Sequence, residues 1–149
     1  MILITPHLSL AEATHTSTGI ENIPTAEHLG NIKLLAEKVF EPLRVLVGNK
    51  PIKLNSVYRS AKVNKAVGGS TTSQHSKGQA MDLCATNMTN AKLGRLIMDN
   101  LDWDQLIFEN PKNKEPQWIH VSYSKTRNRK QVLIFTAGKY IPFKDSLIH

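Results

Sequence analysis

The apolar residues of this chain change their spacing once, and this change restricts the folds open to it. Between Leu29 and Leu46 they recur at intervals of three and four, as on a helix with one buried face. From residue 52 onward, short segments alternate between apolar and polar residues, as in half-buried strands. Helices early in the chain and strands late in it predict an α+β fold.

Capping and turn residues set the bounds of the expected elements. The first helix begins after Thr25 and ends at Gly48-Asn49, with a kink or break at Pro42. Residues 1–24 show no period and are expected to form an extended arm that lies on the domain. Two further helices are expected over 60–67 and 89–100, a loop over 70–77, and strands over 52–58, 79–85, 104–109, 118–123 and 131–136.

The composition is typical of one domain without disulfides. A chain of 149 residues, 40% of them hydrophobic, can bury one core and is too short for two ordinary domains, so residues 1–149 are expected to form a single domain. Cys84 is the only cysteine, which excludes an internal disulfide and a zinc finger built on several cysteines. Any bound metal must therefore be held by histidine and carboxylate side chains.

The net charge of +7 indicates a surface that attracts polyanions, such as an anionic cell-wall polymer. The sequence shows no recognisable nucleic-acid motif, so no specific nucleic-acid partner is expected.

The first residues, Met-Ile-Leu-Ile-Thr-Pro, lack the features of a signal peptide, and no apolar run approaches the roughly 20 residues that span a bilayer. We therefore expect a monomer without a transmembrane segment, located in the cytoplasm of the producing cell.

The segment from Ser73 to Asp82 carries the strongest chemical signal. His75 offers an imidazole nitrogen and Asp82 a carboxylate oxygen, and both suit a tetrahedral zinc ion. Their spacing does not fit one helix face, but it fits a loop histidine that reaches over the start of a strand, with Gly78 permitting the turn. A catalytic zinc needs a third protein ligand, and His120, in the middle of an apolar strand, is the best candidate.

These residues resemble a known family of zinc peptidases. The pattern Ser73-x-His75-x-x-Gly78-x-Ala80-x-Asp82, followed by Trp118-x-His120, is similar to that of the zinc D-Ala-D-Ala carboxypeptidases, the M15 peptidases. The phrases around 55–60, 67–70, 104–109 and 119–122 resemble a phage-associated branch of that family, and the resemblance covers roughly residues 5–125. It implies an antiparallel sheet that carries a zinc ion on His75, Asp82 and His120, with helices packed on it, as in hedgehog domains.

The family resemblance leaves the general base open. Many members carry an acidic residue three positions before the last zinc histidine, where this chain has the neutral Gln117. Glu109 and Glu115 remain, and the hedgehog pattern, with a glutamate that ends the preceding strand, favours Glu109. Hydrolysis needs such a carboxylate to accept a proton from water and return it to the leaving amine.

Strand alternation supports Glu109 independently. If segments 104–109 and 118–123 pair with Glu109 opposite Trp118, then Glu109 lies on the sheet face of His120. It is then a diagonal neighbour of His120, with Cα atoms about 7–8 Å apart. A slip of one residue would turn Glu109 to the other face. Glu115 falls in the connecting loop and stays the alternative base.

Three further residues are candidates for binding substrate. Arg59, at the end of a strand, can grip a carboxylate or steady the oxyanion that develops during hydrolysis. By resemblance, its counterpart in the family binds substrate or the transition state. Ser73 is expected to bond substrate or to shape its loop, and Trp118 to line the cleft or to pack.

The sequence therefore predicts a zinc-dependent peptidase that hydrolyses peptidoglycan stems or cross-links. The resemblance implies a phage endolysin or virion-associated lysin that meets the wall after membrane disruption. The alternative is a non-catalytic, zinc-containing binding module of hedgehog-like type, since fold alone does not establish activity.

Overall fold

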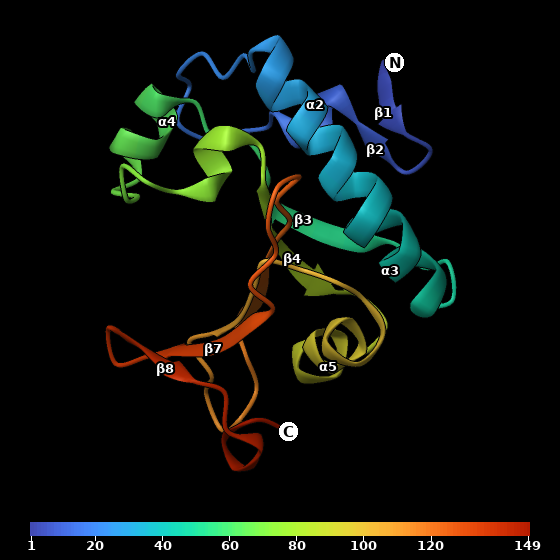
Figure 1. The fold of residues 1–149 in the computed structure, drawn as a ribbon, viewed down its shortest axis with the longest axis vertical. Helices are drawn as coiled ribbons and strands as arrows, with labels where there is room; N and C mark the ends of the chain where they lie inside the picture. Colours follow the sequence, from blue (N-terminus) through green and yellow to red (C-terminus); the bar gives the residue numbers. More distant parts are fainter.

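The computed structural model describes residues 1–149 and confirms the α+β fold, with a six-stranded sheet at its centre (Figure 1). The strands lie in the order β3-β4-β6-β5-β7-β8, and every neighbouring pair is antiparallel except β5 and β7, which run parallel. Their bounds are β3 Ile52–Ser56, β4 Ala80–Ala85, β5 Gln105–Glu109, β6 Trp118–Ser122, β7 Gln131–Thr136 and β8 Lys139–Pro142.

The expected first helix is continuous but changes its winding. It consists of α2 (Ala26–Leu35), a π-helical turn (Ala36–Phe40) and α3 (Glu41–Leu46). The π-helical turn ends two residues before Pro42, which has no backbone N–H to continue the regular ladder. Thr25 caps the start through a side-chain oxygen that accepts from the backbone N–H of His28, and the chain leaves the helix through Gly48 and Asn49 at positive φ.

The other helices are short except α5. They are α1 (Leu10–Ala13), α4 (Ala61–Ala66), α5 (Asn90–Asn100) and two 3-10 turns, η2 (Gln74–Lys77) and η3 (Asp145–Leu147). In Figure 1, α2, α3 and α5 lie on one side of the sheet, while the β7–β8 hairpin extends from its far end. None of the helices is long and apolar enough to cross a membrane.

The first 24 residues contain a small hairpin, β1 (Leu3–Thr5) and β2 (Leu8–Ser9), followed by α1. Ser9 and Glu12 form a capping box at the start of α1. The hairpin is tied to α3, because the Glu41 carboxylate accepts hydrogen bonds from the Thr5 hydroxyl at 2.8 Å and the His7 backbone at 2.9 Å. This segment therefore lies on the helical layer.

One face of the sheet forms the core and the other carries polar residues. Leu83, Phe108 and Ile119 are fully buried beneath α5, and the alternation of the strands turns Asp82 and His120 to the opposite face. The helix lies close to the sheet at Gly94, where a Cβ atom would come within 2.4 Å of the Phe108 ring. The polar face, which carries Asp82 and His120, is therefore supported by a tightly packed core on the other side of the sheet.

Candidate metal centre

Three side chains from three elements meet on the polar face of the sheet. His75 comes from η2, Asp82 from β4 and His120 from β6, and one ligand atom of each lies within 4.8 Å of the others. Asp82 and His120 are direct partners across the β4–β6 ladder. The structure therefore brings together the three residues that the sequence predicts as metal ligands.

His75 is held in place by its local backbone. The Ser73 hydroxyl accepts a hydrogen bond from the His75 backbone N–H at 3.2 Å, and Gly78 ends the 3-10 turn at a φ of 73°. A Cβ atom at position 78 would lie 2.4 Å from the His28 carbonyl oxygen on α2, so only glycine fits there. The turn that carries His75 is thereby pressed against the helical layer.

The hydrogen bonds of His75 define which nitrogen is free. Its Nδ1 lies 2.7 Å from the Val57 carbonyl oxygen, which can only accept, so Nδ1 carries the proton. Its Nε2 is buried and lies 3.2 Å from Asp82 Oδ2, without any partner in hydrogen-bond geometry. A buried nitrogen with an unused lone pair is the arrangement expected of a metal ligand oriented by a backbone carbonyl.

The protonation states of the three residues also suit a cation. Burial lowers the pKa of His75, although the neighbouring Asp82 carboxylate opposes this shift, so the imidazole is neutral. Burial opposes the ionisation of Asp82, but the neighbouring imidazoles of His75 and His120 outweigh it and hold the pKa of Asp82 well below its ordinary value. Two imidazoles and one carboxylate are the donor set of an open zinc site.

His120 completes the cluster. Its Nδ1 lies 3.0 Å from Asp82 Oδ1, and its ring stands edge-on to that of His75 with the centroids 5.2 Å apart. Cys84, the next residue of β4 on this face, is not part of the cluster, because its thiol donates to the Gln117 carbonyl oxygen at 3.3 Å. The residues present fit a zinc ion held by His75, Asp82 and His120.

Glu109 lies on the same face, one strand away. Ile107 is paired with His120 and Glu109 with Trp118, which confirms the register expected from strand alternation. The Glu109 side chain is buried, and burial raises its pKa to about 7, with Asp82 adding to the shift and His120 opposing it. A carboxyl group that titrates near neutrality can both accept and donate a proton.

The Glu115 carboxylate is bound at the start of α5, away from the metal cluster. Its carboxylate oxygens accept hydrogen bonds from the backbone N–H groups of Asn90 at 2.9 Å and Ala91 at 3.1 Å. These are the first residues of α5, where a negative charge is stabilised by the unpaired N–H groups and the helix dipole. Glu115 therefore stabilises the start of α5 and does not line the groove of the metal cluster.

Arg59 follows β3 and lies beside the metal cluster. Its backbone N–H donates to the His75 carbonyl oxygen at 3.1 Å, and its side chain is half-buried. Burial lowers the pKa of the guanidinium, while the charge of Asp82 acts in the opposite direction. The Nε of Arg59 is buried without a hydrogen-bond partner, so the guanidinium has an unused donor near the cluster.

The metal cluster lies in a groove of ≈ 1010 Å³ that crosses several strands. Its lining includes residues between Gly68 and His75, Ser73 among them, and Trp118 on β6. A smaller hollow of ≈ 260 Å³ shares Arg59 and Asp82 with the groove and continues past β3. The groove therefore extends on both sides of the cluster.

Several residues that line the groove were not predicted as site residues from the sequence. Arg129, Gln131, Leu133 and Tyr140 line the groove from the segment after β6. They reach it because β7 pairs in parallel with β5, so that Gln131 lies beside Gln105 and Leu133 beside Ile107. Strand 131–136 was expected, but nothing in its sequence indicates which strand it pairs with.

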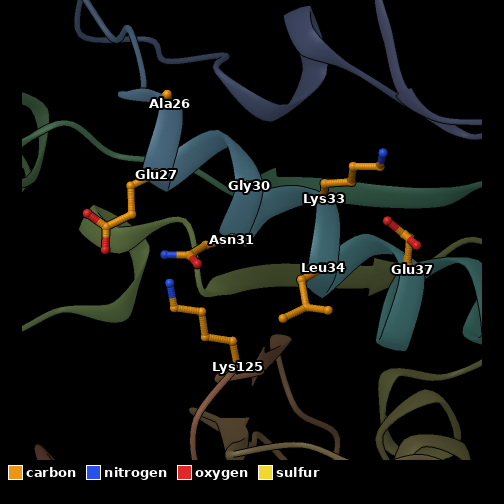
Figure 2. A pocket seen from close by; sticks show the side chains of 8 residues that line it. All are labelled: Ala26, Glu27, Gly30, Asn31, Lys33, Leu34, Glu37 and Lys125. Carbon is orange, nitrogen blue, oxygen red and sulfur yellow. The ribbon is translucent and has the colours of Figure 1, made fainter.

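A further hollow of ≈ 460 Å³ lies away from the metal cluster, along α2. Figure 2 shows Lys125 extending from the chain after β6 toward α2, near Asn31, with charges of both signs on the helix. Asn31 donates to the Lys77 carbonyl oxygen at 2.9 Å, which links α2 to the turn that carries His75. The hollow contains no metal-binding cluster.

The comparison with known families agrees with the geometry. The family model described as Peptidase M15 matches residues 6–122, a segment that includes His75, Asp82, His120, Arg59 and Glu109. No curated protein matches the chain. Because the matched segment covers most of the sequence, the chain belongs to the M15 peptidases, a family of zinc peptidases.

Proposed function

We propose that this peptidase hydrolyses peptide bonds in the stems or cross-links of peptidoglycan, as a phage endolysin or a virion-associated lysin. The observation that supports it best is the position of Glu109, on the same sheet face as three residues suited to hold zinc and one strand from His120. A hydrolase that acts on an extended peptide needs an acid–base group beside an open metal site, and a long groove that holds the substrate.

The groove suits a peptide stem. Its lining is mainly polar, with side-chain amides from Gln74, Gln79, Gln105 and Gln131. Amide side chains can pair with the N–H and C=O groups of an extended peptide. Because the groove continues past Arg59 into the smaller hollow, it has room for substrate residues on both sides of the cleaved bond.

Zinc on His75, Asp82 and His120 would supply Lewis acidity that polarises the scissile carbonyl and makes a water molecule more acidic. Glu109, as the carboxylate, takes a proton from the attacking water while the water oxygen bonds to the carbonyl carbon. The same carboxyl group then gives that proton to the amine nitrogen as the C–N bond breaks. The Arg59 guanidinium steadies the negative charge that develops on the former carbonyl oxygen.

Release of new amines from purified peptidoglycan tests the proposal. Zinc-loaded protein should release amines, a chelator should abolish the release, and added zinc should restore it. Protein that keeps its zinc and sediments with the walls but releases no amines would instead be the non-catalytic binding module. Zinc-loaded protein that neither binds nor cleaves the walls would place the substrate of this peptidase outside peptidoglycan.

A further inference from the structure

The far end of the groove is built by residues beyond the family-matched segment. The match ends at residue 122, and Arg129, Gln131, Leu133 and Tyr140 all follow it. These residues add to the lining of the groove without contributing a metal ligand. This part of the groove therefore belongs to the β7–β8 extension of this chain and not to the matched catalytic segment.

Arg129 is held rigidly at this end. Its Nε lies 2.8 Å from Asp104 Oδ1 and its Nη2 lies 3.0 Å from Asp104 Oδ2, a two-pronged pair. The Arg129 backbone N–H donates to the same carboxylate at 2.9 Å. Nη1 has no hydrogen-bond partner in the protein, and the side chain is 48% exposed. One edge of the guanidinium is thus fixed by the fold while the other is free.

Asp104 is built to hold this arginine. It is buried, and the hydrogen bonds from Arg129 hold its pKa below the ordinary value although burial opposes them. Gln74 Nε2 also donates to Asp104 Oδ2, at 2.8 Å. Since Gln74 precedes the metal ligand His75, the Asp104 carboxylate joins the arginine to the turn that carries the metal centre.

The distance from Arg129 to the reacting centre corresponds to a short stretch of peptide. The Arg129 backbone N–H is bonded to Asp104, the residue before Gln105, and the Gln105 side chain donates to that of Gln131 at 2.7 Å, two residues after Arg129. Ile107 is paired with His120. Gln105 and Ile107 are alternate residues of one strand, which places them about 7 Å apart. An extended substrate covers this span with about two residues.

The charges at this end favour an anion. The acidic residues that line the groove are Asp82, a member of the metal cluster, and Glu109, at the opposite end of β5 from Gln105. The amide side chains of Gln74 and Gln131 lie near Arg129, since Gln74 bonds the same Asp104 carboxylate and Gln131 is two residues away. Lys77 is a further basic residue of the groove lining. A negatively charged substrate group thus meets the free edge of a guanidinium whose carboxylate partner, Asp104, is buried against its other edge.

We propose that Arg129 determines specificity by binding a substrate carboxylate about two residues from the cleaved bond. This inference rests on the proposed peptidase function. It assigns the substrate class as acidic stem peptides, and it makes Asp104 the positioning residue that presents the guanidinium.

The test compares two synthetic stem peptides that differ only in whether one carboxylate is free or amidated. Zinc-loaded wild-type protein should cleave the free acid with a kcat/KM roughly tenfold or more above that of the amide, the scale of one charge-assisted hydrogen bond. The double variant Asp104→Asn/Arg129→Gln should lose this preference, so that its kcat/KM is equal for the two peptides, while it keeps its zinc. Both partners are replaced because Arg129→Gln alone would leave a buried unpaired carboxylate.

Arg127→Gln is the matched control, since Arg127 is exposed and does not line the groove. It removes the same charge and should keep the preference. Calorimetric binding of both peptides to the metal-free wild-type chain gives a second readout without turnover, with the free acid binding more tightly. Equal kcat/KM and equal affinity for the two peptides would overturn the assignment, as would a double variant that keeps the preference. Zinc-loaded protein that cleaves neither peptide, yet binds the free acid more tightly, would contradict the peptidoglycan function and not the role of Arg129.

Discussion

Glu109 on β5 is paired directly with Trp118 on β6, and this pairing puts the carboxyl group on the metal face of the sheet. Glu109→Gln keeps the size of the side chain but removes the proton acceptor. Turnover of peptidoglycan should fall by a factor of roughly 10² or more, the scale of general acid–base catalysis. Zinc content, measured by elemental analysis, should not change.

Glu115→Gln is the control for this prediction. A glutamine has one acceptor oxygen for the two N–H groups of α5 that Glu115 now serves, and no charge. The free energy of unfolding should fall by about 1 kcal/mol, as for a lost helix cap, with little change in rate at 25 °C. A fully active Glu109→Gln together with an inactive, folded Glu115→Gln would reverse the two roles.

Glu109 should also make the stability of the metal-free protein depend on pH. Its pKa is about 7 in the folded protein against an ordinary value of 4.5, so the folded state binds the proton more tightly than the unfolded state. This contribution to stability is present below pH 4.5 and is lost as the pH rises to about 7. Relative to Glu109→Gln, the wild type should lose on the order of 3 kcal/mol between pH 4.5 and 8. Urea unfolding of both chelator-treated proteins measures this difference, and a constant difference across this range would contradict a desolvated Glu109.

Each of the three metal ligands should be necessary for zinc binding. His75→Ala, Asp82→Ala and His120→Ala each leave two protein ligands where an open site needs three. Elemental analysis after mild chelation should show about one zinc per wild-type chain and strongly reduced zinc in every variant. Full occupancy in any one of them would remove that residue from the ligand set.

Arg59→Lys tests whether the role of Arg59 depends on the planar shape of its guanidinium or only on its positive charge. An ammonium keeps the positive charge but cannot reproduce the planar two-pronged grip of a guanidinium. The variant should fold and keep zinc, while its kcat/KM on a stem peptide falls by tenfold or more, since a charge-assisted hydrogen bond contributes roughly 1.5–3 kcal/mol. Wild-type kinetics would make Arg59 a structural residue only.

Adhesion to cell walls should depend on salt. The net charge of +7 attracts anionic wall polymer, and exposed charges are screened beyond a Debye length of about 8 Å at physiological ionic strength. Co-sedimentation of the protein with purified walls should therefore weaken along a salt series. Retention that does not change with salt would indicate a specific pocket in place of general attraction.

The metal face was predictable because its signals are local. Alternation along 104–109 and 118–123 indicates which side chains share a sheet face, and pairing Glu109 with Trp118 puts Glu109 on the face of His120, as the structure shows. His75, Asp82 and His120 follow from their chemistry and their place on a turn and two strands. The family resemblance then joined these pieces into one site.

The far end of the groove was not predictable in the same way. A parallel pair such as β5 and β7 has no connecting turn that marks it, so the sequence gives no sign that Arg129 reaches the groove. The β7–β8 hairpin did leave a signal, since Ala137 and Gly138 at positive φ form the type of short turn that joins two strands. The Ser9-to-Glu12 capping box was a similar mark of α1 within a segment expected to be extended.

Gly78 limits how this enzyme can be reshaped. The exposed residues 70–72 on the rim of the groove tolerate new side chains, because they face solvent. Position 78 accepts none, since a Cβ atom there would collide with the His28 carbonyl oxygen and the φ of 73° disfavours any other residue. A new specificity should therefore be sought by changing residues 70–72 and leaving Gly78 unchanged, because the turn that carries His75 is held by α2, a helix with no residue in the lining of the groove.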